Sequence, residues 1–492
     1  MSSTTTLPRP ASAGEPLGSG SPAPPEGRAP LRRVRRATLT VVCVTTAMLM
    51  LDIAVVNTAM PAIAGDLHIG LSGGQWVVDA YTLSLAALVL SAGSLADRLG
   101  RRRVLVAGLV LFSAASLACA AATGIGVLVV ARALQGAGGA ALFAVSLPLI
   151  GSAFVLEKAR ARALAIYGAT IGAAFVVGPL LGGVLTEHLG WRWIFLVNVP
   201  VGLACLALTA AGVRESRDAN PRRLDVAGLL LLCAALFLAV LGLLRGNADG
   251  WTSARVLGSL GLAAVAMAAF VVVEARAGEP MLPLSMFANR AFTATQLAAF
   301  AISSSFFAVF LYLTLYLQGV LGLSPVAAGA VYLPGTVVMF VVSGATAGLL
   351  DRIRADVALT ASLLLVGAGL ALMVVGGLHS SWGAIVPGFV LAGIGTGVFN
   401  PVMSGLVLAE SAAERHGLAT GINDSFRQTG IAVGIAGLGA LFPTVSAFGG
   451  DPAAFVEGLH RALWVASATA VCGAAAAGAL FIRQRSRRRA VD

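Results

Sequence analysis

The sequence predicts an all-α membrane protein with fourteen transmembrane helices. Of its 492 residues, 58% are hydrophobic and only 11% are charged, whereas a soluble globular domain carries about 25% charged residues. Apolar runs of about 20 residues, the length needed to cross a bilayer, recur from one end of the chain to the other. A segment in lipid must satisfy its backbone hydrogen bonds internally, so these runs are expected to be helices.

The predicted spans follow one another with short connections. The longest connections, 275–292 and 446–460, are too short to hold a soluble catalytic domain, which argues against a membrane enzyme. Residues 1–36 are rich in Pro, Ser, Gly and Ala and are expected to be a disordered tail. The predicted spans are 37–61, 76–95, 103–122, 125–150, 162–186, 193–213, 224–244, 256–274, 293–317, 326–350, 357–377, 382–408, 424–445 and 461–482.

The placement of Arg and Lys predicts the orientation. The formal net charge is +11, but the cations lie in short clusters between apolar runs, which indicates topology signals and argues against a nucleic-acid partner. With the N-terminus in the cytoplasm, the clusters at 98–103, 214–223 and 483–489 all lie inside, as the positive-inside rule requires. An even number of spans returns the C-terminus to the same side. We therefore expect a multi-pass protein of the cell membrane, monomeric, with both termini cytoplasmic.

The five cysteines and five histidines do not form a metal-ligand pattern. The cysteines lie inside apolar runs without a CxxC spacing, and the histidines are scattered at different span ends. The chain also has no Walker-type phosphate loop. We therefore expect no metal, no cofactor and no enzymatic activity, with a proton gradient as the energy source.

Asp52 in the first span and Arg132 in the fourth are ionisable residues inside the membrane, which are functional candidates by default. At 1.5 Å per residue, both lie roughly 10–14 Å below the outer surface and could pair. Burial and a neighbouring arginine act in opposite directions on a carboxylate, so Asp52 could exchange protons. A substrate that displaces Arg132 would then change the protonation of Asp52. The alternative is a fixed ion pair that joins two helices.

Asp79 is a second candidate for proton coupling, a few residues into the second span. The alternative for this carboxylate is a hydrated position at the membrane interface. Further polar or aromatic side chains on spans are candidates for the lining of a substrate cavity. Few ionised groups among many apolar ones suit an amphipathic organic compound. The cavity candidates are Asn57, Tyr81, Gln135, Tyr312, Tyr316 and Asn400.

The segment GSLADRLGRRR connects the second and third spans. Its first glycine would allow close helix approach, and its aspartate could accept hydrogen bonds from a neighbouring helix N-terminus. Its second glycine suits a tight turn, and its arginines would anchor the loop in the cytoplasm. The residues concerned are Gly93, Asp97, Arg98, Gly100 and Arg101.

The segment GATIGAAFVVGPLLGG (168–183) places small residues along one stripe of the fifth span. Such a stripe permits tight packing against another helix, and its proline allows a bend. A hinge that seals one side of a central cavity and simple helix packing are both open interpretations. Its conformational candidates are Gly178, Pro179, Gly182 and Gly183.

Asp424 and Arg427 begin the predicted thirteenth span. We interpret them as a gate or helix-end pair rather than a substrate site.

Together these motifs resemble the major facilitator superfamily and, more narrowly, the fourteen-helix branch of the drug:proton antiporters. GSLADRLGRRR resembles the signature loop of the superfamily, and RALQGAGGA (132–140) resembles its motif in the fourth span. GPLLGG (178–183) resembles the motif associated with antiporters. LDIAVVNTAMP (51–61) and WRWIFLVNVPVG (191–202) resemble signatures of the fourteen-helix branch.

The resemblance implies a major facilitator fold of two six-helix bundles, 37–213 and 293–482, with an inserted helix pair at 224–274 and a basic tail at 483–492. Substrate would bind between the bundles, with rocking-type alternating access. Arg132 would assist proton transfer and Asp52 would be the coupling acid. The resemblance also implies that Asp97 steadies the inward-closed loop against the start of the thirteenth span.

The second half departs from this pattern. GLLDRIR (348–354) only partly resembles the signature loop, and the tenth span has no acidic residue before Asp351. Some relatives that export cationic drugs carry an acid there, so a strongly cationic or dicationic substrate is not expected.

The sequence therefore predicts a proton-coupled exporter of drugs, antibiotics or other secondary metabolites, with protons, a small-molecule substrate and the bilayer as partners. A narrow-substrate metabolite transporter of the same superfamily is the alternative within transport. A non-transporting membrane sensor is a further alternative, but it would have no need for Asp52 and Arg132 at matching depth.

Overall fold

The structure is a computed structural model, and it describes residues 28–154, 156–218, 224–349, 352–412, 415–443 and 450–489. Asp351 of the partial signature loop lies outside the described residues. Thirteen helices in the described part of the chain are long and apolar enough to cross a membrane. The further long helix is α16 (His416–Gly439), which corresponds to the predicted thirteenth span. Its polar side chains, including Asp424, Arg427 and Gln428, lower its hydropathy.

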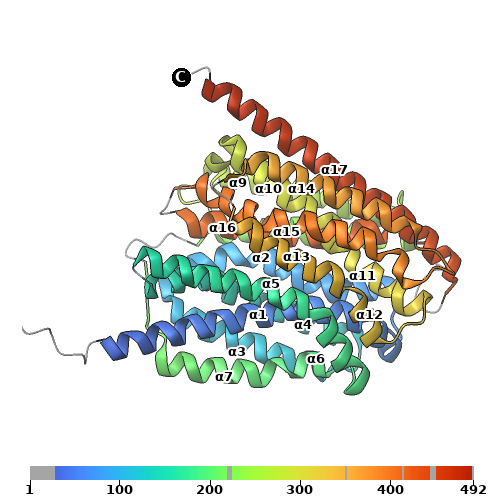
Figure 1. Cartoon of the computed structure of the whole chain (residues 1–492), viewed down its shortest axis with the longest axis horizontal. Coiled ribbons are helices and arrows are strands. Elements are labelled where there is room, and N and C mark those ends of the chain that lie inside the picture. The colour runs from blue at the N-terminus through green and yellow to red at the C-terminus, as the bar shows by residue number, and fades with distance from the viewer. Residues whose placement is uncertain are drawn as a thin grey trace, which may run out of the picture.

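The first six spans form one bundle, which lies in the lower half of the view (Figure 1). Within it α2 packs against α4, α3 against α4, and α1 against α5 and α7. The sixth span is divided into a short and a long helix. The elements are α1 (Arg28–Leu67), α2 (Leu71–Leu99), α3 (Arg101–Ala120), α4 (Ile125–Ala153), α5 (Glu157–His188), α6 (Trp193–Leu196) and α7 (Asn198–Gly212).

The last six spans form the second bundle. In it α14 packs against α15 and α17, α13 against α15, and α10 against α16 and α17. The ninth span contains two π-helical turns, and the tenth is divided at Tyr332. The elements besides α16 are α10 (Arg290–Ile302), η3 (Ser303–Phe307), α11 (Ala308–Leu315), η4 (Tyr316–Val320), α12 (Pro325–Val331), α13 (Leu333–Ala347), α14 (Ala355–Leu372), α15 (Val386–Ala409) and α17 (Pro452–Arg489).

The inserted pair, α8 (Val226–Asp249) and α9 (Ala254–Arg276), lies over the seam between the bundles. α8 packs against α2 of the first bundle and α16 of the second. Trp76 of α2 and Phe237 of α8 have ring centroids 5.6 Å apart. Asn247 of α8 donates to the Ala440 carbonyl just beyond α16, at 2.7 Å. The inserted pair therefore contacts both bundles.

Two helices begin earlier than the hydropathy pattern predicts. α1 begins at Arg28 and therefore includes the last part of the tail that was expected to be disordered. α16 begins at His416, so Asp424 and Arg427 lie in its interior and not at its start. Both helices extend through polar residues, which a search for apolar runs leaves out.

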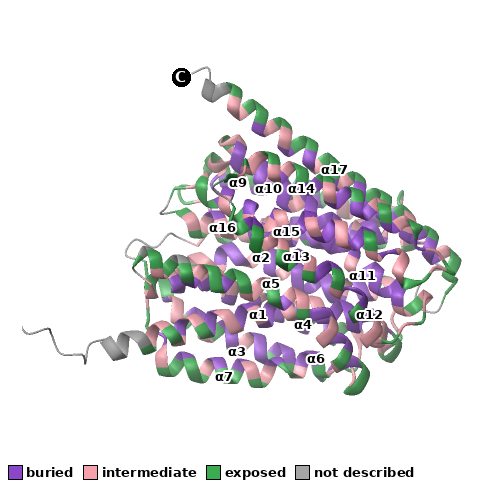
Figure 2. Ribbon diagram, viewed as in Figure 1, coloured by how far each residue is buried: buried purple, intermediate pink, exposed green. Residues whose placement is uncertain are grey.

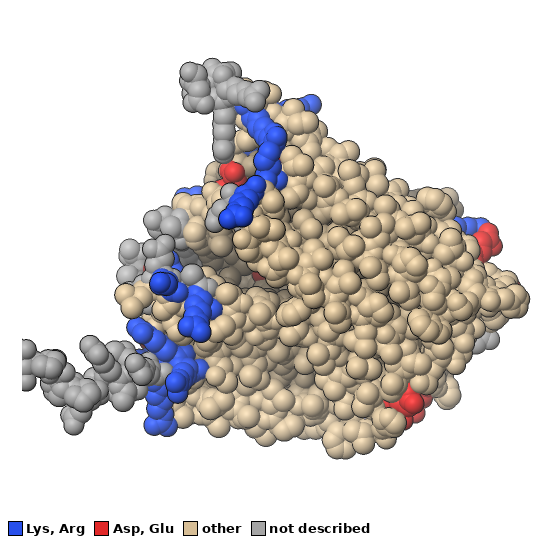
Figure 3. All heavy atoms as spheres, viewed as in Figure 1, with Lys and Arg blue, Asp and Glu red and all other residues tan. Residues whose placement is uncertain are grey.

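The bundles meet closely at one end of the molecule and separate at the other. At the end where α5 finishes, a Cβ atom added to Gly329 would lie 2.5 Å from the Pro179 carbonyl oxygen, so α12 approaches the α5 backbone directly. At the opposite end, where α1 begins and α17 finishes, Lys and Arg gather and the surface is hollowed between the bundles (Figure 3). We call the latter the arginine-rich end and the former the closed end.

Buried residues concentrate where helices face one another, while the outward faces of the helices stay exposed (Figure 2). Many of those exposed side chains are large and apolar, among them Val130, Leu203 and Val265, each at least 58% exposed. Such an apolar exterior is expected for helices that contact lipid tails.

Candidate functional site

Asp52 and Arg132 are in direct contact in the middle of the first bundle. The Arg132 Nη1 atom lies 2.5 Å from the Asp52 Oδ2 atom, and the two side chains are 1% and 0% exposed. α1 supplies the carboxylate and α4 supplies the guanidinium. The matching depth expected from the sequence thus corresponds to a buried ion pair.

The Asp52 carboxylate has two further donors. The Gln135 Nε2 atom donates to Asp52 Oδ1 at 2.8 Å, and the Asn198 Nδ2 atom donates to the same oxygen at 3.2 Å. Gln135 also donates to the Ser116 hydroxyl at 2.9 Å. The carboxylate on α1 is therefore held by side chains from two other helices, α4 and α7.

The Arg132 guanidinium also has several partners besides Asp52. Its Nη1 atom donates to Gln135 Oε1 at 2.6 Å, and its Nε atom donates to the Val77 carbonyl at 3.0 Å. The guanidinium carbon lies 4.3 Å from the centre of the Tyr81 ring. A buried ion pair is tolerated only when such hydrogen bonds compensate for the water that both charges have lost.

Asn198 and Ser116 were missed by the sequence analysis. Both are neutral, so they give no sign as strong as a charged residue in an apolar span. Asn198 lies inside the segment WRWIFLVNVPVG, whose only role there was as a family signature. An amide in the middle of an apolar segment was the available signal.

Asp79 lies outside this network. It is 0% exposed, and neither of its carboxylate oxygens has a hydrogen-bond partner among the described residues. The alternative of a hydrated interfacial carboxylate is therefore wrong. The cause is the packing of α2 against α16, which seals this face of α2 inside the protein.

A polar seal joins the bundles one helical turn from Asp79, toward the closed end. Gln75 donates its Nε2 hydrogens to the Tyr312 hydroxyl at 2.8 Å and to the Ile435 carbonyl at 3.1 Å. Tyr312 donates its own hydroxyl hydrogen to Ile435. A second bridge runs from the Gln318 side chain to the Thr58 carbonyl at 2.8 Å. These bonds connect α1 and α2 with the second bundle.

Most of the predicted cavity residues do not line an open cavity in this conformation. Tyr81 and Gln135 belong to the Asp52 network, and Tyr312 belongs to the seal. Tyr316 is buried and donates to the Gly377 carbonyl at 2.8 Å. Asn57 is 8% exposed, and its Oδ1 atom has no partner among the described residues. Asn400, on α15, is half-buried. Sequence spacing alone does not show which helix face meets the other bundle.

The loop between α2 and α3 behaves as expected at one glycine and not at the other. Gly100 has φ +113°, and a Cβ atom there would lie 2.6 Å from the Glu215 carboxyl group, so the tight turn requires glycine. A Cβ atom at Gly93 would meet nothing within 4 Å, so the expected close helix approach is wrong there. Arg98, at the end of α2, is exposed.

Asp97 pairs with Arg101 of the same loop at 2.9 Å. Among the described residues it makes no bond to the start of α16. This agrees with a structure whose bundles are separated at the arginine-rich end, because that contact was expected only for an inward-closed loop.

The residues of the glycine motif in α5 pack against two different helices. A Cβ atom at Gly178 would lie 2.5 Å from the Ala54 Cβ atom, and one at Gly182 would lie 2.8 Å from the Val55 Cα atom, so this side packs against α1. Pro179 and Gly183 instead face α12 of the second bundle. The stripe therefore serves helix packing and also closes one end of the bundle boundary.

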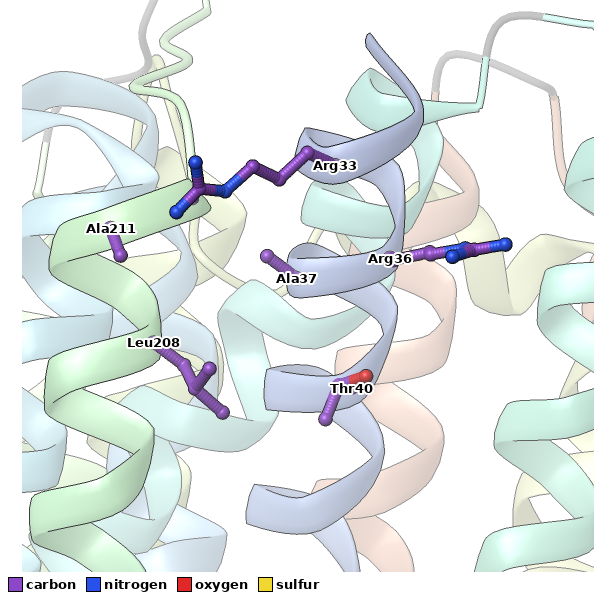
Figure 4. A pocket seen from close by; sticks show the side chains of 7 residues that line it. Arg33, Arg36, Ala37, Thr40, Leu208 and Ala211 are labelled. Atoms are coloured by element: carbon purple, nitrogen blue, oxygen red, sulfur yellow. The ribbon is translucent and has the colours of Figure 1, made fainter. Parts of the chain in front are cut away.

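A crevice of about 530 Å³ lies between α1 and α7 at the arginine-rich end (Figure 4). Arg33 reaches across it toward Ala211, whereas Arg36 points away from α7. Thr40, its deepest residue on α1, precedes Asp52 by twelve residues, or about 18 Å of helix. The crevice is thus separate from the proton-binding candidates. Its lining is Arg33, Arg36, Ala37, Thr40, Leu208, Ala211 and Gly212.

Comparison with known proteins agrees with this architecture. The sequence model of the Major Facilitator Superfamily matches residues 42–435. The multidrug resistance protein Stp of Mycobacterium tuberculosis is 38% identical over 397 residues, covering 80% of this chain and 73% of its own. The puromycin resistance protein pur8 of Streptomyces alboniger is 36% identical and covers 88% of each chain.

The multidrug efflux pump LfrA of Mycolicibacterium smegmatis is 34% identical, covering 90% of this chain and 87% of its own. Among solved structures, a peptide transporter in complex with sulfate superimposes with a TM-score of 0.66 at 17% sequence identity, covering 92% of this chain and 99% of that one. That likeness concerns the fold.

The match to a transporter family and the similarity to efflux pumps show that this two-bundle membrane protein is a transporter and not an enzyme. The chain belongs to the Major Facilitator Superfamily, in its drug-efflux branch. The predicted fold class is confirmed.

Proposed function

We propose that this protein is a proton-coupled exporter of amphipathic organic compounds that works by alternating access. The observation that carries the proposal is the buried contact between Asp52 and Arg132, with the carboxylate also held by Gln135 and Asn198. When a proton binds the Asp52 carboxylate, its electrostatic attraction to Arg132 is lost. The names of the relatives, which refer to drug and antibiotic resistance, support export.

The arginine-rich end is proposed to face the cytoplasm of the cell membrane, so both termini are cytoplasmic. This follows from the positive-inside rule. The described conformation is then open to the inside and closed to the outside. It corresponds to the state that accepts a compound from the cytoplasm or the inner leaflet.

A proton that binds Asp52 removes the negative charge to which Arg132 is bound. The guanidinium still contacts the Gln135 side chain, the Val77 carbonyl and the Tyr81 ring. The ion pair that joins α1 to α4 is lost. α1 is also the helix whose Thr58 accepts the bridge from Gln318, six residues or about 9 Å beyond Asp52. Protonation inside the first bundle is thereby linked to the seal between the bundles.

Asp79 is proposed as a second proton-binding group. An ionised carboxylate without a partner in a dry environment costs several kcal/mol, so Asp79 carries its proton in this conformation. It lies one turn from Gln75 on α2. Separation of Gln75 from Tyr312 would expose Asp79 to the outside, where the proton can exchange.

Alternating access then requires that the polar bridges at the closed end break together. These are the bonds from Gln75 to Tyr312, from Gln318 to Thr58, and from the Val326 amide to the Glu187 carboxylate at 2.9 Å. Each is a single neutral or exposed hydrogen bond, worth about 0.5–1.5 kcal/mol. A seal of this strength can open without unfolding either bundle. The proton gradient supplies the energy, and no cofactor is required.

The proposal is tested by proton release from energised inside-out vesicles when amphipathic aromatic compounds, puromycin among them, are added. We expect wild type to release protons and Asp52→Asn to release none, with both proteins present at equal amounts. Equal responses would move the coupling acid away from Asp52. Binding of a compound without any proton release or flux in wild type would favour a sensor and contradict transport.

A further inference from the structure

Within the described part of the chain, Arg427 at the boundary between the bundles has no salt-bridge or hydrogen-bond partner. It lies in the interior of α16 and is half-buried. None of the ion pairs and hydrogen bonds formed within the described part of the chain involves its guanidinium. It interacts electrostatically with Asp424 of the same helix, and Tyr167 of α5 lies nearby across the boundary. This differs from the helix-end pair expected from the sequence.

The guanidinium of Arg427 lies beside an aromatic cluster. Its Cζ atom is 5.9 Å from the centre of the Phe307 ring. Phe307 in turn lies 5.5 Å from Phe175 of α5, between ring centres, so the cluster spans the boundary between the bundles. Phe310, which is half-buried, stacks with Phe307 at 6.4 Å and with Tyr332 at 5.2 Å.

This arrangement places one available charge next to several ring faces. Asp424 is only 7% exposed, and among the described residues it forms no salt bridge with Arg427. Asp52 is neutralised by Arg132, and Asp79 is sealed. Arg427 is therefore a charged group beside the aromatic cluster, where a molecule that binds the rings would meet it. A partly desolvated guanidinium that forms no salt bridge or hydrogen bond gains from an anionic or strongly accepting oxygen.

We propose that Arg427 and the aromatic cluster of Phe175, Phe307 and Phe310 form the substrate-recognition site, and that the site selects aromatic compounds bearing a carboxylate or another strongly accepting oxygen over aromatic cations. The proposal rests on the assignment of the protein as an exporter. Arg427 binds the oxygen, and the rings bind the flat apolar part. Phe175 belongs to the first bundle, so an occupied site contacts both bundles, as a site used for alternating access requires.

The test compares two probes that share a ring system and differ in charge. Pyrenebutyrate and pyrenebutyl-trimethylammonium are titrated against the purified full-length protein, without a proton gradient, and binding is followed by fluorescence anisotropy. We expect wild type to bind the carboxylate at least about tenfold more tightly than the cation. Arg427→Gln should remove this preference, and Arg427→Lys should keep part of it.

Phe307→Leu is the matched control for the aromatic part. It should weaken both probes by similar factors, because it removes a ring face and no charge. Binding of the cation to Arg427→Gln, at the affinity seen in wild type, shows that the variant is folded. Tighter binding of the cation by wild type, a carboxylate affinity unchanged in Arg427→Gln, or binding of neither probe to monodisperse wild type would each overturn the proposal.

These outcomes are separate from those of the transport assay. Binding is measured at equilibrium, so Asp52→Asn should keep the preference for the carboxylate probe even if it abolishes proton release. A charge preference that depends on Arg427 in a protein that moves no protons would contradict the exporter assignment and leave the recognition site standing.

Discussion

Gln75 of the first bundle donates a hydrogen bond of 2.8 Å to the hydroxyl of Tyr312 in the second bundle. Gln75 is 3% exposed and Tyr312 is 0% exposed, so the bond is shielded from water. It lies one turn from Asp79 and at the closed end of the boundary. The pair therefore connects the conformational seal with a buried acid.

Removing this bond should favour opening of the closed end. For Gln75→Ala we expect the outward-open fraction to rise about five- to thirtyfold, because one or two net hydrogen bonds of about 1 kcal/mol are lost. In a cysteine-free background, a cysteine introduced at Thr58 should react correspondingly faster with an impermeant maleimide added outside. Unchanged labelling would show that the Gln75 bonds do not hold the boundary closed.

Gly329 should tolerate no added methyl group. A Cβ atom there would lie 2.5 Å from the Pro179 carbonyl oxygen, so Gly329→Ala forces α12 away from α5. We expect impaired closure, seen as faster outside labelling of the same Thr58 reporter, and loss of most transport. Gly344→Ala in α13 is the control, since a Cβ atom there meets nothing within 4 Å. Equal effects of the two substitutions would contradict the assignment of the α5–α12 contact.

The Asp52–Arg132 pair should show strong coupling in stability. Arg132→Ala leaves a buried carboxylate without its cation and should destabilise the first bundle by about 3–5 kcal/mol. Adding Asp52→Asn removes the stranded charge, so the double variant should unfold at a higher temperature than Arg132→Ala alone. Thermal unfolding in detergent measures both effects. A double variant less stable than Arg132→Ala alone would show that the two side chains act independently.

Substitution of Asp79 should affect transport and leave stability nearly unchanged. Its carboxyl group has no partner among the described residues, so if Asp79 carries its proton as proposed, Asp79→Asn replaces a neutral acid by a neutral amide of the same shape. We expect little change in unfolding temperature and a marked loss of substrate-induced proton release. Asp97→Asn, in the exposed loop, serves as a comparison for stability. A large destabilisation by Asp79→Asn would identify Asp79 as a structural group instead.

The charged centre of the site was predictable from the sequence, and its neutral partners were not. Asp52 and Arg132 are conspicuous because ionisable residues are rare in apolar spans, and the fixed rise of a helix gives their depth. Asn198 and Ser116 complete the network, but neutral side chains at these positions do not stand out. Their role depends on which helices become neighbours.

The packing of the two bundles against each other could not be predicted from the sequence either. Tyr312 and Tyr316 were expected to line a cavity, yet both are buried, because the face that each helix turns to its neighbours is set by tertiary packing. The predicted thirteenth span, 424–445, misses the start of α16 at His416, since the polar residues of this helix lower its hydropathy. The close approach at Gly329 depends on two helices, α5 and α12, that are more than 130 residues apart.

The most direct measurement of the central claim compares two modes of transport in proteoliposomes that contain purified protein. One mode is the accumulation of a radiolabelled compound driven by an imposed pH gradient, and the other is its exchange against unlabelled compound without a gradient. The compound is the one that gives the largest response in the vesicle assay. If Asp52 couples protons to substrate, Asp52→Asn will lose gradient-driven accumulation and keep exchange. Gradient-driven accumulation by Asp52→Asn at the wild-type level would contradict the account.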